Sequence, residues 1–446
     1  MPLPRISATT DTLISTLGDE ALSAAQLIQR LDCSQPSLSR LVRAAGASVL
    51  TLGKAKQTRY GRARPTGAEQ PIAMTQIDGQ GTPQPCGSLH AIGLLAGSRT
   101  AWASHQRLEI YDGLPWFIAD MRPQGFIGRQ FPARVPQLGL PTSVADWSDN
   151  HVLAALCAAG ADEPGDLVLG RAALDRFLQQ PVSQPISQRR KASVYSQLAS
   201  GSASQSHNPS SAGGEQSKFT AYVQTPDGAS HVIVKFSPPG SDPVAQRWRD
   251  LLRAEHHALA VLGQHQARTG VRAAQAQLID ADRLYLEVRR FDRIGARGRT
   301  GVVSLGAVDD VFVGQRHNWV QTAQQLQRLR MLAQRDVQRI SLLYAFGLLI
   351  HNTDMHFGNL ALLHEGPASK QFALAPFYDM LPMRFAPTAQ GLATVTVPTV
   401  LPNADLLSVW PQAKELGSEF WQRVRTDKAI SRGFAQIAKA AAPPAQ

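Results

Sequence analysis

Apolar residues recur at helical spacing in three successive stretches near the start of the chain, and an alternating pattern follows them. The pattern predicts three helices and then two strands, over residues 13–17, 23–31, 34–44, 48–52 and 57–60. A serine stands at the N-cap of the second and third helices, and a proline falls in the first turn of the third. The order of three helices and a hairpin predicts a winged helix-turn-helix domain over residues 1–66.

The next part of the chain has weaker periodicity. It predicts strands at residues 101–103 and 108–111 and helices at residues 149–159 and 170–178. Between residues 184 and 217 the chain is rich in Ser, Gln and Gly. That composition is typical of a flexible loop or linker.

Periodicity sharpens after residue 217. The pattern predicts, in order, a hairpin (219–224, 231–236), a helix (243–262), two strands (277–279, 284–288), two helices (321–332, 334–350) and two strands (360–363, 371–374). A β-rich piece followed by a helical piece predicts an α+β fold with two lobes and a cleft between them. We therefore assign residues 67–290 to an N-terminal lobe, which includes the Ser/Gln/Gly-rich stretch, and residues 291–446 to a helical C-terminal lobe.

The composition is that of a globular protein. Of 446 residues, 43% are hydrophobic and 18% are charged, which excludes a disordered or fibrous chain. The three cysteines lie far apart, so we expect neither a disulfide framework nor a cysteine-rich zinc site. The N-terminus lacks the apolar core of a signal peptide, and the longest apolar run, residues 340–350, is shorter than the roughly 20 residues that span a bilayer. We expect a cytoplasmic protein without a membrane partner.

Positive charge is concentrated at the N-terminus. Lys and Arg number 45 against 34 for Asp and Glu, a net charge of +11, and residues 1–65 hold nine basic and four acidic residues, a net charge of +5. No acidic residue interrupts the basic run of the predicted hairpin and its exit, which includes Arg62 and Arg64. We expect DNA contacts from Ser37, Arg40, Arg43, Lys54, Lys56 and Arg59. The alternative is a small domain for protein contacts with a solvated basic hairpin.

The candidate chemistry gathers in a loop between a predicted helix and a predicted strand. The segment His351-Asn-Thr-Asp354-Met-His356-Phe-Gly-Asn359 places Asp354 and Asn359 five residues apart. In a kinase catalytic loop with this spacing, the Asp orients and deprotonates a hydroxyl and the Asn binds metal. Asp379 follows the next strands and can hold Mg²⁺ as a second carboxylate. We take Asp354 and His356 as catalytic residues and Asn359 and Asp379 as metal ligands.

Two upstream elements suit phosphate binding. Lys235 lies on a predicted strand and can pair with the α- and β-phosphates of ATP, and Glu255 on the next helix can pair with Lys235. The segment Ser-Ser-Ala-Gly-Gly-Glu-Gln-Ser-Lys218 precedes the hairpin. Gly213 and Gly214 let its backbone approach a phosphate closely, and its N–H groups with Lys218 can cradle the anion. The segment is not a Walker A motif.

Three other functions fit parts of this pattern. Zinc ligation by His351 and His356 is one, but the sequence offers no convincing set of further ligands. A metal-dependent DNA nuclease that uses Asp354, His356 and Asp379 is another, because a helix-turn-helix could deliver it to DNA. The third is a DNA-binding transcriptional regulator whose kinase fold is catalytically idle.

In this order, the motifs resemble those of the HipA-type serine/threonine kinases, which are toxins of bacterial toxin–antitoxin systems. The matching segments are Ser-Ser-Ala-Gly-Gly-Glu-Gln-Ser-Lys218, Val-Ile-Val-Lys235-Phe, Arg253-Ala-Glu255, Val288-Arg-Arg-Phe-Asp-Arg293, Asn352-Thr-Asp-Met-His-Phe-Gly-Asn359 and Ala375-Pro-Phe-Tyr-Asp-Met380. The resemblance implies a two-lobed protein-kinase-like fold that holds ATP and Mg²⁺ in its cleft. It makes Asp354 the catalytic base, and it makes Arg289 to Phe291 the hinge that meets adenine.

The same resemblance implies regulation and partners. A serine of the Gly-rich loop, Ser211 or its neighbour Ser210, would be autophosphorylated, and this modification would silence the kinase. The substrate would be a protein, for which the family's aminoacyl-tRNA synthetase targets are the candidate. This chain resembles the variant with a fused N-terminal winged helix-turn-helix, which would bind operator DNA, inhibit the kinase, or both. Since such domains often bind DNA as dimers, a homodimer is a further expectation.

Overall fold

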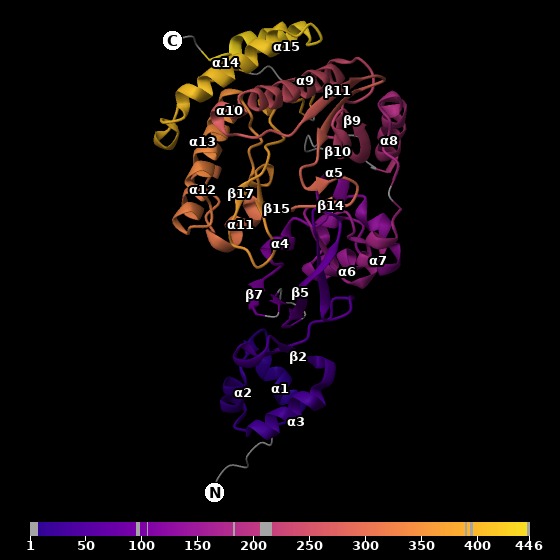
Figure 1. Cartoon of the computed structure of the whole chain (residues 1–446), viewed down its shortest axis with the longest axis vertical. Helices are drawn as coiled ribbons and strands as arrows, with labels where there is room; N and C mark the ends of the chain where they lie inside the picture. Colours follow the sequence, from indigo (N-terminus) through magenta and orange to yellow (C-terminus); the bar gives the residue numbers. More distant parts are fainter. Residues whose placement is uncertain are drawn as a thin grey trace.

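The computed structural model describes residues 8–94, 99–104, 106–181, 183–205, 216–388, 390–392 and 396–443. Helices and strands mix along the chain, which confirms the predicted α+β class. The molecule is elongated, with the N-terminal helices at one end and α14 (Trp410–Thr426) and α15 (Arg432–Ala441) at the other (Figure 1). Among the described residues, no helix has both the length and the apolar character needed to cross a membrane.

Three helices and a three-stranded antiparallel sheet form the N-terminal region. Ser23 and Ser34 cap the second and third helices by accepting hydrogen bonds from the N–H groups of Gln26 and Ser37. Gly46 ends the third helix with φ 55°, which glycine adopts without strain. The predicted helices and hairpin are confirmed, and an unpredicted short strand completes a sheet of order β1-β3-β2. The elements are α1 (Thr10–Leu17), β1 (Ala21–Leu22), α2 (Ala24–Leu31), α3 (Gln35–Ala45), β2 (Val49–Leu52) and β3 (Arg59–Arg62).

Arg64 joins the N-terminal region to the next one. The charge pattern places this residue in a basic surface, but its side chain is buried. Its guanidinium group donates hydrogen bonds to Asn150 Oδ1 and to the backbone carbonyls of Ile92 and Arg99. Arg64 therefore anchors the exit from the hairpin and does not contribute to the basic surface expected there.

A five-stranded antiparallel sheet of order β7-β6-β5-β4-β8 organises the middle region. Beside it, Trp116 is fully buried, with its ring 5.3 Å from that of Phe372 and 6.1 Å from that of Phe312. The main hydrophobic core therefore runs from this region into the C-terminal part of the chain. The elements are β4 (Ile72–Ile77), β5 (Pro83–Ile92), β6 (Arg99–Ala103), β7 (Leu108–Asp112), α4 (Trp116–Ala119), α5 (Gly125–Gly128), α6 (Asp149–Ala159), β8 (Leu167–Leu169) and α7 (Arg171–Gln179).

Helix α8 (Lys191–Gln205) occupies much of the stretch predicted as a flexible loop, so that prediction is wrong here. Lys191, Tyr195 and Ala199 recur every four residues and are buried on the side of the next sheet. Lys191 Nζ lies 2.8 Å from a carboxylate oxygen of Glu287, and the Tyr195 hydroxyl donates a 2.6 Å hydrogen bond to the same oxygen. One of the three positions on the buried face of this helix is a lysine. Because lysine is usually exposed, the composition of the stretch did not reveal a buried helix face.

A second antiparallel sheet follows, with the order β11-β12-β10-β9. Helix α8 covers one of its faces, where Val232 and Val234 are buried. Helix α9 packs on the sheet from the other side. The predicted hairpin, helix and strands are confirmed. The elements are β9 (Lys218–Thr225), β10 (Gly228–Phe236), α9 (Pro243–Gln264), α10 (Gln266–Thr269), β11 (Ala276–Asp280) and β12 (Leu284–Arg289).

The C-terminal part is mainly helical, as predicted. A short β13–β14 hairpin leads into it, and a small sheet of order β15-β16-β17 lies against the middle region. The predicted pair of long helices is confirmed as α12 and α13. The elements before α14 are β13 (Arg293–Ile294), β14 (Gly298–Arg299), β15 (Gly301–Ser304), α11 (Leu305–Phe312), α12 (Trp319–Arg328), α13 (Gln334–Leu349), β16 (Ala361–His364) and β17 (Ala373–Leu374).

Candidate active site

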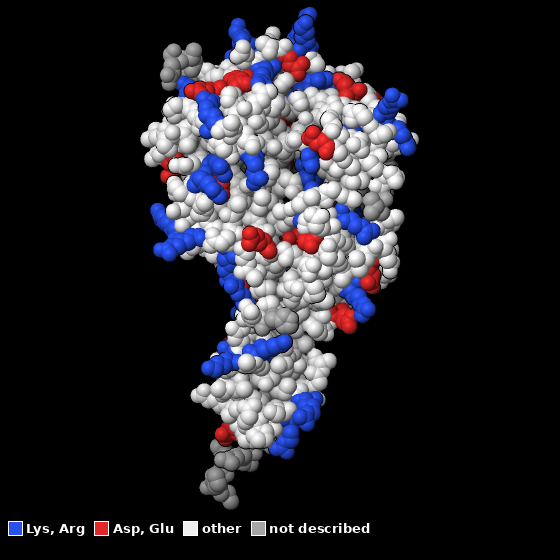
Figure 2. Space-filling model, viewed as in Figure 1, with Lys and Arg blue, Asp and Glu red and all other residues white. Residues whose placement is uncertain are grey.

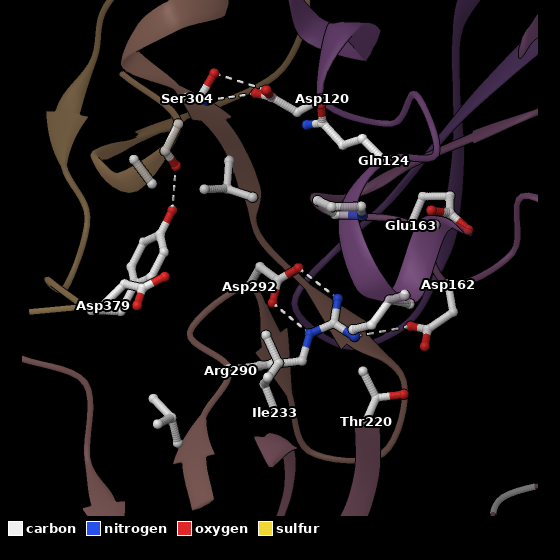
Figure 3. Close-up of a pocket in the computed structure, with 18 of the residues that line it drawn as sticks. Asp120, Gln124, Asp162, Glu163, Thr220, Ile233, Arg290, Asp292, Ser304 and Asp379 are labelled. Atoms are coloured by element: carbon white, nitrogen blue, oxygen red, sulfur yellow. Dashed lines mark hydrogen bonds and ion pairs between the residues drawn. The ribbon is translucent and has the colours of Figure 1, made fainter. Parts of the chain in front are cut away.

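A cavity of about 400 Å³ lies where the β9–β12 sheet, the C-terminal part and the middle region meet. Ile233 and Val288 line it from the sheet, and Ala361 lines it from the C-terminal part. Figure 3 shows Asp379 on one side of the cavity and Glu163 of the middle region on the other. The cavity therefore has walls from three parts of the chain.

Lys235 joins the two carboxylates that the sequence places with it. It lies on β10 and is 6% exposed. Its Nζ donates to both carboxylate oxygens of Glu255 on α9, at 2.6 and 2.9 Å, and to Asp379 Oδ1 at 2.6 Å. The structure thus brings together a lysine, a helix carboxylate and a loop carboxylate at the inner end of the cavity.

The electrostatics of the three groups differ. Burial would raise the pKa of Asp379, but the ammonium groups of Lys235 and Lys218 outweigh it and hold this pKa below its usual value. Glu255 has a raised pKa, because its complete burial outweighs the attraction of Lys235. Burial acts to lower the pKa of Lys235, and the two carboxylates reverse this and raise it. We therefore expect a charged Lys235 and an ionised Asp379 at neutral pH.

The loop after α13 holds Asp354 in a braced conformation. The backbone N–H of Asp354 donates to Asn352 Oδ1 at 3.0 Å, and Asn359 Nδ2 donates to the backbone carbonyl of Asp354 at 2.8 Å. The Asp354 carboxylate itself is exposed. Partial burial and the charge of Asp379 raise its pKa. The five-residue spacing therefore closes a loop that presents a carboxylate to solvent beside the cavity.

The two histidines of this loop lie in different surroundings. His356 lines the cavity, and its Nδ1 accepts a hydrogen bond from the Gly358 N–H at 3.0 Å. His351 is buried, with its ring packed near those of Phe385 and Trp421. No group of three or more His, Cys, Asp or Glu that could hold a metal ion occurs among the described residues. The structure therefore gives the zinc hypothesis no support.

The connection between β12 and the C-terminal part forms another edge of the cavity, lined by Arg289 and Phe291. The Arg289 N–H donates to the Gln275 carbonyl, whereas the N–H and C=O of Phe291 make no hydrogen bond within the described residues. The Phe291 ring lies 5.7 Å from that of Tyr378, whose hydroxyl donates to the Gly358 carbonyl at 3.0 Å. Tyr378 thus joins this connection to the loop that holds Asp354 and Asn359.

Lys218, at the start of β9, pairs in register with Lys235 on β10. Its charge acts on the carboxylates of Asp379 and Asp354. Four other predicted residues of the Gly-rich segment, Ser210, Ser211, Gly213 and Gly214, lie outside the described residues.

The chemistry of Asp379 and Asn359 fits a magnesium ion. Mg²⁺ takes oxygen ligands and shares them with nucleotide phosphates. Asp379 contributes a carboxylate on the cavity wall, and Asn359 directly follows the cavity residue Gly358, two residues before β16 begins. These two residues could hold the ion, as their motifs predict.

The middle region contributes residues that sequence reasoning did not find. Asp120 accepts hydrogen bonds from the Ser304 N–H at 2.5 Å and from the Ser304 hydroxyl at 2.8 Å, which closes one end of the cavity. Glu163 lies 3.7 Å from Arg134 Nη1, and its burial raises its pKa to about 7. No motif surrounds either acid, so only the folded chain brings them to the site.

The predicted DNA-binding residues lie far from this cavity, at the other end of the molecule (Figure 1). Arg40 and Arg43 are exposed on α3, and Lys54 and Lys56 are exposed between β2 and β3. Figure 2 shows basic side chains gathered where α3 lies. The remaining two are partly buried: Ser37, near the α3 N-cap, and Arg59, which donates to the Thr58 carbonyl.

Comparisons with known proteins agree with the motif order. Residues 68–178 match the family described as "YjjJ-like toxin, middle domain", and residues 210–442 match the "HipA-like C-terminal domain". The chain is 37% identical to Toxin YjjJ of Escherichia coli (strain K12) over 423 residues, which cover 94% of this chain and 93% of the relative.

Two solved structures show weaker similarity. One is HipA from the Shewanella oneidensis MR-1 complex of HipA, HipB and operator DNA, with 14% identity, a TM-score of 0.43 and coverage of 80% of this chain and 92% of that chain. The other is the Helicobacter pylori proinflammatory kinase CtkA, with 11% identity, a TM-score of 0.33 and coverage of 50% and 86%. The family assignment rests on the sequence matches, and by these the chain belongs to the HipA-like toxins, in the group that contains YjjJ.

Proposed function

We propose that the protein is an ATP- and Mg²⁺-dependent serine/threonine protein kinase of the cytoplasm that inhibits growth and binds DNA through its N-terminal region. One observation carries the proposal: Lys235 bridges Glu255 and Asp379 at the inner end of a cavity large enough for a small ligand. A kinase needs this set, because the lysine holds phosphates, the helix carboxylate orients the lysine and the loop carboxylate binds metal.

In the proposed phosphoryl transfer, different residues bind the phosphates, the adenine and the metal ion. Lys235 and Lys218 attract the phosphates of ATP, and the Phe291 N–H and C=O offer hydrogen bonds to the adenine edge. Asp379 and Asn359 hold Mg²⁺, which neutralises charge on the β- and γ-phosphates when bound. Catalysis of this reaction is mainly positioning and electrostatic stabilisation, so the pre-arranged lysine and carboxylates favour it.

Asp354 is the proposed base. Its carboxylate is exposed beside the cavity, where a serine or threonine hydroxyl of a protein substrate can approach it. The Asn359 and Asn352 side chains hold its backbone, which orients the carboxylate toward that hydroxyl. His356, on the cavity wall two residues away, assists this orientation. The proposed protein substrate is an aminoacyl-tRNA synthetase, and Ser211 or Ser210 is the proposed site of autophosphorylation.

We also propose that residues 1–66 form a winged helix-turn-helix that binds DNA, as a homodimer. Three helices precede the β2–β3 hairpin, and β1 adds a third strand beside β3, which is the order such a domain needs. Helix α3 presents Arg40 and Arg43 to solvent, and Ser37 stands near its start. This arrangement supports placing α3 in a major groove, with Lys54 and Lys56 on the flanking phosphates.

Incubation of the purified chain with γ-labelled ATP and Mg²⁺ tests the kinase. We expect incorporation of phosphate into a serine of the chain and into a bacterial lysate protein, and we expect Asp354→Ala and Asp379→Asn to abolish both. Equal incorporation by wild type and Asp354→Ala would reject the assignment. Phosphoproteomics of cells that express each form then identifies the substrate.

The nuclease alternative has one structural observation in its favour: His356 and Asp379 line the same cavity, with Asp354 beside it. Plasmid cleavage with Mg²⁺ in the absence of ATP would support it over the kinase. DNA binding that is unchanged in Asp379→Asn, together with no ATP binding by the wild type in calorimetry, would instead support the idle-kinase regulator.

A further inference from the structure

A second, smaller cavity lies beside the first. Its volume is about 100 Å³, against about 400 Å³ for the main cavity, and Asp162 lines both. The chain after α7, strands β9 and β10 and the β13–β14 hairpin enclose it. Its lining includes Arg293, Arg297 and Arg299, together with Tyr222 on β9 and His231 on β10.

Two of these arginines have no acidic partner. Arg297 donates hydrogen bonds to the backbone carbonyls of Leu178 and Gln180, and Arg299 donates to that of Ala161. Within the described residues neither guanidinium group forms an ion pair with a carboxylate. Both therefore bring positive charge to the cavity, and their close neighbours are neutral backbone carbonyl groups and the Phe177 ring.

Two acids close to the small cavity, Asp162 and Asp292, are paired with other arginines. Asp292 accepts hydrogen bonds from Arg290 and Arg293 at 2.8 to 3.0 Å. Asp162 lies 2.9 Å from Arg293 and 3.4 Å from Arg290. The charges of Asp162 and Asp292 also act on Arg299, and Arg299 in turn acts on Asp166. Within the described residues, however, no carboxylate lies at ion-pair distance from Arg297 or Arg299.

Arg299 is the more deeply buried of these two arginines. It is 5% exposed, and its Nη1 is enclosed without a hydrogen-bond partner among the described residues. The face of the Phe177 ring, 4.8 Å away, is its other neighbour. Burial, followed by the charge of Arg293, lowers the pKa of Arg299 to about 9. Keeping a cation buried with no carboxylate at ion-pair distance is unfavourable, and an anion in the adjacent cavity would supply a closer counterion.

We propose that the small cavity binds a tetrahedral oxyanion of the phosphate class, with Arg297 and Arg299 as its main ligands. Guanidinium groups suit this anion because they donate two parallel N–H groups and keep their charge when buried. Tyr222 also lines the cavity and carries a neutral hydroxyl donor. The cavity is a quarter of the volume of the main one, which suits inorganic phosphate or a small phosphomonoester. The site is separate from the proposed kinase site and does not depend on that function.

Calorimetric titration of the full chain with inorganic phosphate tests the proposal at constant ionic strength, with acetate as the planar-anion control. We expect one phosphate per chain, no acetate binding, and an affinity lowered about tenfold or more in Arg299→Gln. Lys235→Met, which alters the main cavity, is expected to leave this phosphate affinity unchanged. O-phosphoserine in a parallel titration distinguishes the sources: tighter binding of phosphoserine identifies a monoester, and tighter binding of phosphate identifies the free ion.

Equal phosphate affinity in wild type and Arg299→Gln, or no binding of either probe, would overturn the proposal. Because Arg299 is buried, the melting temperature of Arg299→Gln must first show that it folds, and the more exposed Arg297→Gln replaces it otherwise. Crystals of the wild type grown with selenate give a direct check. Anomalous selenium density beside Arg299 supports the site, and density elsewhere alone rejects it.

Discussion

The ammonium group of Lys235 holds two carboxylates, Glu255 and Asp379, that are 124 residues apart in the sequence. Neither carboxylate has another cationic partner at hydrogen-bond distance within the described residues. The lysine is therefore both the proposed phosphate ligand and the counterion of the buried Glu255 and the half-buried Asp379.

The Lys235→Met substitution tests whether Lys235 contributes more to activity and stability than an ordinary surface lysine does. We expect phosphate incorporation to fall by about 10²-fold or more, because a pre-arranged positive group is lost from the transition state. Urea unfolding should also show a loss of about 3 kcal/mol, since the buried Glu255 carboxylate and the half-buried Asp379 carboxylate lose their partner. The matched control is Lys370→Met, whose half-exposed pair with Glu109 (3.1 Å) is worth about 1 kcal/mol or less. Similar losses in both variants would contradict the burial argument.

Glu163 predicts a pH dependence. Its folded-state pKa is raised to about 7 by burial, above the ordinary value of 4.5. The folded state therefore binds more protons than the unfolded state between these values, and the free energy of unfolding should fall as the pH rises from about 4.5 to 7.

Urea unfolding at pH 5 and pH 7.5 measures this effect. We expect the fall in stability to be smaller in Glu163→Gln, because the amide does not titrate. Exposed Glu365→Gln serves as the control and should behave as the wild type. An identical fall in wild type and Glu163→Gln would show that burial does not hold the proton on Glu163.

At the residue scale, the sequence predicted those site residues that occur in motifs. The spacing of Asp354 and Asn359 has a local cause, since the two close one loop by a hydrogen bond. Asp120 and Glu163 carry no such signal. They reach the cavity because the middle region packs on the C-terminal part, and that packing depends on tertiary contacts between distant segments.

At the scale of single elements, helix α8 shows why composition misled. Serines and glutamines dominate it, yet Lys191, Tyr195 and Ala199 repeat every four residues and are buried. In the sequence, a helical repeat that contains a lysine looks like a polar stretch. It can be recognised as a buried face only when the carboxylate that pairs with the lysine is known. The partner is Glu287, on a strand 96 residues away in the sequence. By contrast, the N-caps Ser23 and Ser34 act within three residues and were predictable.

A double-mutant cycle tests the attachment of α8. Lys191→Met should destabilise the chain by about 3–5 kcal/mol, because it leaves the Glu287 carboxylate buried with only the Tyr195 hydroxyl beside it. Adding Glu287→Leu should recover most of this loss, since no charge then remains buried. Urea unfolding provides the values. If the two losses simply add, the pair is not coupled and the buried-charge argument fails.

At the scale of the whole molecule, the middle region links the other parts. It reaches the C-terminal part through Asp120 and Ser304, and it reaches the chain after β12 through Asp162, which lies 2.9 Å from Arg293. The N-terminal region lies at the opposite end of the middle region (Figure 1). The proposed DNA contacts and the cavity are thus separate surfaces of one elongated molecule.

This separation predicts that DNA affinity and kinase activity respond to different substitutions. The double substitution Lys54→Gln and Lys56→Gln should make the plot of log affinity against log salt concentration shallower. The magnitude of its negative slope should fall by about 2, because two phosphate contacts are lost. Incorporation of phosphate from ATP should not change. Lys428→Gln, at the other end of the chain, is the control. Fluorescence anisotropy over a salt series measures the slope, and an unchanged slope would remove the hairpin from the DNA interface.

The order of the parts along the chain also has a consequence for biosynthesis. Lys235 and Glu255 leave the ribosome well before Asp379, and at about 5–20 residues per second the interval for 124 residues is about 6–25 s. During that time the nascent chain has its complete N-terminal region and two of the three bridging groups, but it lacks Asp379, the proposed metal ligand. A ribosome that stalls in this window therefore releases a product that contains the basic end and lacks the proposed toxic activity.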